Sequence, residues 1–176
     1  AFENESLTAL NAALLASDLW NHDLNNATGA RKMRLRALWL SGTTFPEKLE
    51  KAIHSANGPE ATVHLLKDEI QNNESQEQSK YRLELTTIMM SVLENHGKPK
   101  KAFFEAMKSI RKWPQNYFLH RQLRKYTELA QKEEEALFTL QDLLKREHQK
   151  EEPTAFILES IGRVQHLMLD ETKAFE

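Results

Sequence analysis

The stretch Gly97-Lys98-Pro99-Lys100-Lys101-Ala102 is a short polar turn that leads into an alanine and then into an amphipathic helix. Two further stretches have the same form: Gln131-Lys132-Glu133-Glu134-Glu135-Ala136 and Leu169-Asp170-Glu171-Thr172-Lys173-Ala174. Ala102 and Ala136 lie 34 residues apart, which is the period of a two-helix repeat, and Ala174 follows 38 residues after Ala136. Units of this kind bury their apolar faces by stacking on one another. The sequence therefore predicts stacked helical hairpins.

The composition is that of a folded, helix-rich protein. Of the 176 residues, 40% are hydrophobic and 28% are charged, with only five glycines and five prolines. This length suits one ordinary domain core or about four to five helical hairpins. The formal net charge of -2 argues against a protein that binds nucleic acid over its whole surface. Cysteine is absent, which excludes disulfides, thiolate metal sites and cysteine nucleophiles.

Prolines and apolar periodicity divide the chain into helices. Each proline stands where a helix should begin, a position at which its missing N–H is not needed. Gly58 and Gly97 fall just before two of these starts, as helix-ending glycines do. Apolar residues recur at spacings of three and four, and no long alternation of period two indicates a strand. We predict an all-α fold with ten helices, at 5–24, 27–41, 46–56, 59–72, 76–96, 99–113, 115–130, 133–150, 153–168 and from 170 onward.

Other segments bear on the limits of the domain and on its environment. The polar run 71–79 is predicted as a loop followed by an exposed first helical turn, and it is a weak boundary rather than a linker. The last predicted helix has only two turns before the sequence stops, so we expect a fragment of a longer protein. No apolar run of about 18 residues could cross a membrane, and no retained signal peptide is found. We expect a soluble protein, with the cytoplasm slightly favoured.

The same residues resemble the tetratricopeptide repeat family. In that family a small residue stands at repeat position 8, a glycine near 15, an alanine at 20 and a proline near 32 of a 34-residue helix-turn-helix. In a unit over 83–116, Gly97 falls at position 15, Ala102 at 20 and Pro114 at 32. In a unit that starts at 155, Gly162 falls at 8 and Ala174 at 20.

This resemblance implies one helical repeat domain over 1–176. The repeat-like units would be 83–116, 117–150 and 155–176, preceded by a degenerate repeat over 45–82 and by atypical N-terminal helices over 1–44. In the unit 117–150, Arg124 stands where the family has a small residue. The hairpins would stack as a right-handed superhelix with a concave groove. The alternative is an irregular helical bundle, in which the same small residues permit close helix crossings.

In this family the partner usually lies along the groove formed by the first helix of each hairpin. The corresponding positions hold Phe118, Arg121, Lys125 and Glu128 in one unit and Phe156, Glu159, Arg163 and His166 in the next. The partner-binding residues that we select from them are Phe118, Arg121, Lys125, Phe156 and Arg163. Because guanidinium groups pair with carboxylates in a fork, this groove would suit an acidic peptide or protein segment. A second copy of the chain is another partner we consider, since stack ends leave apolar surface bare.

Charge indicates a second surface. Residues 98–125 contain nine basic residues against one acidic residue, a formal charge of +8. Aromatic residues of the types that stack on nucleic-acid bases are interleaved with them. The candidate anion-binding residues are Lys98, Lys100, Lys101, Lys108, Arg111 and Lys112. RNA or another polyanion is therefore the alternative ligand. The structural alternative is that the aromatic residues belong to the core and the charges to a solvated face.

The sequence offers no catalytic constellation. The seven histidines include no pair three or four residues apart, so no local zinc pattern exists. Acidic runs near predicted helix N-termini are explained by the helix dipole, and no glycine-rich phosphate loop occurs. We therefore expect a protein-binding scaffold that is not an enzyme and has no cofactor and no metal site.

Overall fold

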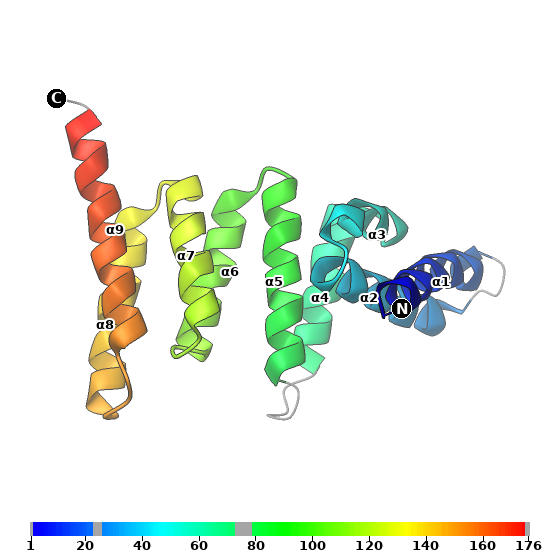
Figure 1. Cartoon of the computed structure of the whole chain (residues 1–176), viewed down its shortest axis with the longest axis horizontal. Coiled ribbons are helices and arrows are strands. Elements are labelled where there is room, and N and C mark those ends of the chain that lie inside the picture. The colour runs from blue at the N-terminus through cyan, green and yellow to red at the C-terminus, as the bar shows by residue number, and fades with distance from the viewer. Residues whose placement is uncertain (1, 23–25, 73–78, 175–176) are drawn as a thin grey trace. The chain divides into compact units, whose positions relative to one another are not determined.

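The computed structural model describes residues 2–22, 26–72 and 79–174 of the chain. Within these ranges every regular element is a helix and no strand occurs (Figure 1), which confirms the all-α prediction. The elements are α1 (Phe2–His22), α2 (Ala27–Thr43), the 3-10 turn η1 (Pro46–Lys48), α3 (Leu49–Ser55), α4 (Pro59–Asn72), α5 (Ser79–Asn95), α6 (Pro99–Lys112), α7 (Tyr117–Ala130), α8 (Glu133–Gln149) and α9 (Ala155–Ala174).

Prolines mark the helix starts closely. Pro46, Pro59 and Pro99 are the first residues of η1, α4 and α6, as predicted. Pro114 and Pro153 lie in the connections before α7 and α9, a few residues ahead of the first helical residue. Of the polar run 71–79, which the sequence predicts as a loop and a first helical turn, residues 73–78 lie outside the described ranges.

Residues with positive φ follow the ends of several helices. Gly58 and Gly97 have φ of 92° and 68°, which confirms them as helix-ending glycines, because glycine has no Cβ to clash in this conformation. Asn57, Gln131 and Glu151 adopt it too, with φ of 66°, 53° and 58°. The sequence gives no signal for Gln131 or Glu151, since residues with long side chains seldom take up positive φ.

The predicted tenth helix is instead the last part of α9, which runs without a break to Ala174. The break predicted between 168 and 170, at the start of the polar stretch 169–174, is helical. The physical reason is that no glycine or proline follows Gly162, so nothing in the sequence ends the helix. The predicted repeat-like unit 155–176 is therefore one helix over its described residues, and its expected turn into a second helix is wrong.

The chain divides into two compact units, Ala1–His96 and Gly97–Glu176, called unit 1 and unit 2 below. The dividing point falls inside the predicted repeat-like unit 83–116, between α5 and α6. α5 packs on α4 within unit 1, and α6 packs on α7 within unit 2. Each half of that predicted unit thus has a packing partner within its own compact unit.

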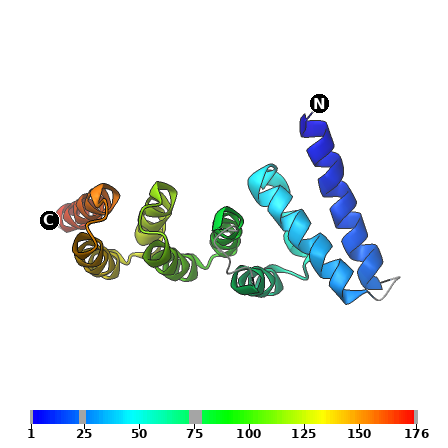
Figure 2. The ribbon, with the colours of Figure 1, turned by 90° about the horizontal axis from the view of Figure 1, so that it is seen from below.

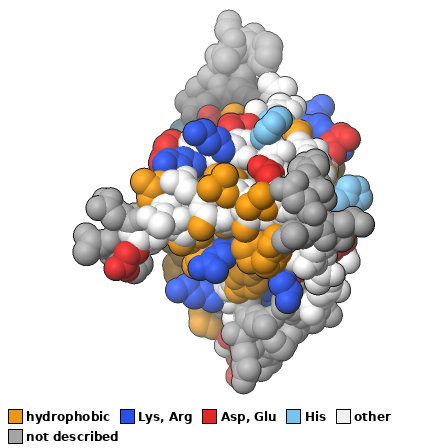
Figure 3. All heavy atoms as spheres, turned by 90° about the vertical axis from the view of Figure 1, so that its right-hand side faces the viewer, with side chains coloured by type: hydrophobic (Ala, Val, Ile, Leu, Met, Phe, Trp, Pro, Cys, Tyr) orange, Lys and Arg blue, Asp and Glu red, His pale blue; other side chains and the backbone are white. Residues whose placement is uncertain are grey.

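Unit 1 is arranged around α2, which packs on α1, α3, α4 and α5. Two glycines let α2 approach its neighbours closely, because an added Cβ at Gly29 would overlap the Trp20 ring and one at Gly42 would overlap the Ile88 side chain. α1 also has an outward side with exposed leucines, of which Leu15 is 65% exposed. Figure 3, which views unit 1 from the side of α1, shows hydrophobic side chains gathered there.

Unit 2 consists of two helical hairpins. α6 pairs with α7 and α8 pairs with α9, while α7 packs on α9 and α6 on α8 (Figure 2). The predicted unit 117–150 pairs α7 with α8, whereas in the structure α7 pairs mainly with α6 and α8 with α9. The observed pairing is therefore shifted by one helix from the prediction. The reason lies in the core, because the fully buried aromatic side chains Phe103 of α6 and Tyr126 of α7 belong to this pair. The second hairpin buries smaller side chains, Leu140 and Leu143 of α8 and Ile157 of α9.

Candidate binding surface between α7 and α9

The first turns of α7 present one polar side toward α9. α7 begins after its cap residue Asn116, whose side-chain oxygen accepts a hydrogen bond from the backbone N of Leu119 at 3.1 Å. A shallow depression lies between the two helices. It is lined by Tyr117, His120, Arg121 and Arg124 from α7 and by Glu159, Ser160 and Arg163 from α9. The α7 residues are spaced by three or four, so they share one helix face.

A buried histidine and a buried serine in the lining of the depression link the two helices. His120 is only 3% exposed. Its Nε2 lies 2.8 Å from the carbonyl oxygen of Pro114, and its Nδ1 lies 2.7 Å from Ser160 Oγ. A carbonyl oxygen only accepts, so Nε2 donates to Pro114, and Nδ1 accepts from the Ser160 hydroxyl. Burial lowers the pKa of His120, although the hydrogen bond to Pro114 and the charge of Glu159 oppose this shift. The imidazole is therefore held neutral with both nitrogens bonded.

Two exposed aromatic rings lie at the edge of the same surface. The rings of Tyr117 and Phe156 are tilted against each other with centroids 5.4 Å apart, and the Phe156 centroid lies 6.3 Å from that of His120. Phe156 is 38% exposed although it packs on both rings. This aromatic pair packs on the protein with one face and is exposed to solvent on the other. It can therefore offer a flat apolar face to a partner.

The charge of the surface is positive. Three arginines and one glutamate line the depression. Glu159 is engaged by Arg163, whose Nε donates to Glu159 Oε1 at 2.8 Å. Among the residues that the structure describes, Arg121 and Arg124 have no hydrogen-bond or ion-pair partner. Two guanidinium groups thus remain with their donors turned to solvent or to a ligand.

The structure brings together three of the five predicted partner-binding residues. Arg121 and Arg163 line the depression, and Phe156 contacts its aromatic edge. Phe118 and Lys125 are exposed on α7 but do not line it. They lie farther around the helix, and the Lys125 ammonium is 5.4 Å from the ring of its neighbour Tyr126.

Sequence reasoning did not select several residues that make up this surface. Tyr117 belongs to the basic and aromatic stretch, Arg124 stands at a repeat position where the family has a small residue, and no pattern in the sequence pairs His120 with Ser160. A signal for the first two was present, because positions 117, 121 and 124 share a helix face. The pairing of His120 with Ser160 depends on how α7 and α9 pack, which the sequence pattern does not specify.

The predicted anion-binding residues gather on a different helix of unit 2. Lys100, Lys101, Lys108, Arg111 and Lys112 are all exposed on α6, and Lys98 is its N-cap. Phe104 stands among them and is 53% exposed. The guanidinium Nη2 of Arg111 donates to Thr139 Oγ1 on α8 at 3.3 Å, so this arginine is held in place.

Two other kinds of site, a metal centre and a membrane span, are not found among the described residues. These residues contain no group of three or more histidine, aspartate or glutamate side chains that could hold a metal ion. None of the described helices combines the length and apolar character needed to cross a bilayer. Comparison of the chain with protein-family models, with curated proteins and with solved structures finds no match.

Proposed function

We propose that this chain is a protein-interaction scaffold whose unit 2 binds an acidic peptide or an acidic segment of a partner protein between α7 and α9. One observation carries the proposal: Arg121 and Arg124 line the same depression and have no acidic partner among the described residues. Arg124 is half-buried and Arg121 is exposed, so both guanidinium groups lie within reach of a ligand on this surface. The fork of an arginine binds a carboxylate through two hydrogen bonds. The role is one of binding, with no chemical step.

Further features of the surface support this role. Tyrosine and arginine are the residue types that contribute most to protein interfaces, and Tyr117 lies directly beside the arginines. The hydrogen bonds of His120 to Ser160 and to Pro114 fix α9 against the start of α7. A surface fixed in advance loses little conformational entropy when a peptide binds. The Tyr117 and Phe156 rings would take an apolar side chain next to the acidic group.

We also propose that the hairpins α6–α7 and α8–α9 are successive units of a tetratricopeptide-like array that continues as a right-handed superhelix. Two adjoining hairpins whose equivalent helices pack on each other are what such an array requires. α7 on α9 and α6 on α8 meet this requirement within unit 2. The repeat unit proposed here is one helix out of register with the units predicted from the alanine spacing.

The peptide proposal is tested by fluorescence anisotropy with a labelled glutamate- and phenylalanine-rich peptide. The double variant Arg121→Ala/Arg124→Ala should weaken binding at least about tenfold, because charge-assisted hydrogen bonds contribute about 1.5–3 kcal/mol each. The matched control is Lys32→Ala/Arg36→Ala, which removes the same charge from exposed positions on α2. Circular dichroism melts should be unchanged in both. Equal weakening by the two variants would show that net charge alone attracts the peptide and would contradict the proposal.

Polyanion binding on α6 is the second candidate function, and the exposed side of that helix favours it. Lys101 and Lys108 lie one turn to either side of the exposed Phe104, so cations surround an aromatic ring that a base could stack on. Filter binding of single-stranded RNA should then weaken steeply with salt, and Lys101→Ala/Lys108→Ala should reduce the salt slope by about two. An RNA that is not retained even at low salt would rule this function out.

A further inference from the structure

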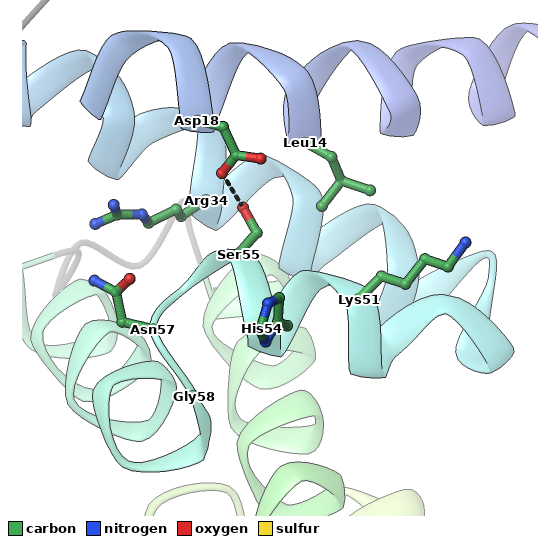
Figure 4. A pocket seen from close by; sticks show the side chains of 8 residues that line it. All are labelled: Leu14, Asp18, Arg34, Lys51, His54, Ser55, Asn57 and Gly58. Atoms are coloured by element: carbon green, nitrogen blue, oxygen red, sulfur yellow. Dashed lines mark hydrogen bonds between the residues drawn. The ribbon is translucent and has the colours of Figure 1, made fainter. Parts of the chain in front are cut away.

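Unit 1 holds a cleft of about 790 Å³ between α1, α2, α3 and the turn before α4 (Figure 4). This volume falls within the range of about 300–1,000 Å³ that is usual for small-molecule sites. The lining residues are Leu14, Asp18, Arg34, Lys51, His54, Ser55, Asn57 and Gly58. Nearly all of them are polar, and one aliphatic side chain, Leu14, is included. The cleft belongs to unit 1 alone and is separate from the peptide surface of unit 2.

The local structure explains why donors converge on this cleft. Lys51, His54 and Ser55 are spaced by three and four along α3, so they lie on one side of that helix. α3 ends at Ser55, and in the turn that follows Asn57 takes a left-handed φ of 66° and Gly58 one of 92°. Asparagine tolerates this backbone conformation better than most residues. The turn thereby brings the Asn57 side chain to the cleft.

The cations of the cleft are not neutralised by the described part of the chain. Arg34 and Lys51 have no hydrogen-bond or ion-pair partner among the described residues. The single carboxylate in the lining, Asp18, lies 3.4 Å from the Ser55 hydroxyl, whose nearer partner is Ser17 Oγ at 3.1 Å. The contrast with Arg31 on the same helix is informative, because Arg31 is paired with Asp68 at 3.5 Å and with Glu69 at 3.8 Å. Arg34 has no such arrangement.

Arg34 is the cation of the lining that the described residues satisfy least. Its Nε atom is buried and has no hydrogen-bond partner, and burial of such a donor costs free energy unless it is satisfied. Figure 4 shows the guanidinium of Arg34 and the amide of Asn57 on the same side of the cleft, with the Lys51 ammonium toward the other. A planar acidic group could accept from both Arg34 and Asn57.

We propose that this cleft binds a small organic anion whose carboxylate or phosphate group pairs with Arg34. Arginine presents its N–H donors in a planar fork that matches both groups, which is why it is common wherever they are recognised. Lys51 and His54 add positive and polar groups along the rest of the cleft, and Leu14 gives it an apolar side. The ligand class is thus an anion with a partly apolar body, bound at a site distinct from the peptide surface.

NMR spectroscopy of the whole chain labelled with nitrogen-15 tests this inference. Inorganic phosphate and succinate are titrated separately, and sodium chloride at matched ionic strength is the blank. Either probe should cause saturable shifts of the Arg34 side-chain Nε–H signal and of the backbone amides of residues 55–58. Binding of phosphate alone or of succinate alone identifies the acidic group that the cleft prefers. If both probes shift these signals no more than chloride does, the inference is wrong.

Matched variants connect the shifts to the cleft. Arg34→Gln should weaken binding at least about tenfold, since it removes charge-assisted hydrogen bonds. Arg36→Gln is the control, because Arg36 is exposed on the same helix and outside the cleft. If Arg34→Gln lowers the melting temperature sharply, Lys51→Gln against Lys32→Gln replaces it as the test. Equal binding in each variant and its control would overturn the assignment.

Discussion

The imidazole Nδ1 of His120 and the hydroxyl Oγ of Ser160 lie 2.7 Å apart and join α7 to α9 in unit 2. Both residues are buried, with exposures of 3% and 6%, so their hydrogen bond is shielded from water. The same imidazole donates from Nε2 to the carbonyl oxygen of Pro114, in the turn that leads into α7. One side chain therefore fixes two helices and a turn, and it lines the same depression as the arginines.

Replacement of Ser160 by alanine should lower the free energy of unfolding of unit 2 by about 1–3 kcal/mol, because it leaves the buried Nδ1 of His120 without a donor. Urea melts followed through amide signals of α7 and α9 would measure the change. Ser91→Ala, at a half-buried position on α5, is the control for losing a helical serine hydroxyl. A loss no larger than in this control would show that the hydrogen bond to His120 contributes little.

His120 should make the stability of unit 2 depend on pH. Burial lowers its pKa below 6.5, so the unfolded chain takes up a proton on this imidazole at a higher pH than the folded chain does. The contribution of neutral His120 to the free energy of unfolding is present in full above the ordinary histidine pKa. It decreases as the pH falls below that value toward the lowered pKa of the folded state. Urea melts at a series of pH values should show this decrease.

The matched variants for the pH effect are His120→Gln and His64→Gln. The first should flatten the decrease between neutral and moderately acid pH, since glutamine does not titrate. His64 is exposed on α4, and its replacement controls for the loss of a histidine as such. Should His120→Gln keep the full pH dependence of the parent chain, another group must be responsible.

The helices could be predicted because local signals set them. Pro59 and Pro99 begin helices where the sequence places them, and Gly58 and Gly97 end them with positive φ. The failure at the C-terminus has the same origin. The stretch before Ala174 is polar, as turns are, but it contains no glycine or proline that would end a helix. α9 therefore continues through it. Polarity without a helix-breaking residue is a weak signal for a turn.

Helix packing and the exact lining of the candidate site could not be predicted in the same way. Arg121 and Arg163 stand at repeat positions and line the same depression. Lys125 does not line it, because the side of α7 that faces α9 depends on how the two helices pack. Gly162 illustrates the same limit. It was assigned to the small-residue position of a repeat, yet an added Cβ there would meet nothing within 4 Å. The close approaches occur instead at Gly29 and Gly42.

Two glycine substitutions should therefore have opposite effects on stability. Gly42→Ala should lower the free energy of unfolding of unit 1 by about 1–3 kcal/mol, because the new methyl group overlaps the buried Ile88 side chain. Gly162→Ala should raise that of unit 2 by about 0.5–1 kcal/mol, since the site is open and alanine is the better helix former. Urea melts of both variants measure the difference. A stabilising Gly42→Ala would show that α2 and α5 are packed less closely than described.

The end of α7 offers a further test, at a residue whose backbone conformation suits glycine better than its own side chain. Gln131 has a φ of 53° and caps α7 with its backbone N–H. A left-handed conformation costs a residue with a Cβ roughly 1–2 kcal/mol, so Gln131→Gly should raise the free energy of unfolding of unit 2. The gain should be smaller than this cost, because glycine also loses more entropy on folding. Gln122→Gly, in the middle of the same helix, should instead lower stability by about 1 kcal/mol. Thermal and urea melts should show a gain in stability for Gln131→Gly and a loss for Gln122→Gly. A destabilising Gln131→Gly would mean that α7 does not end in the left-handed turn.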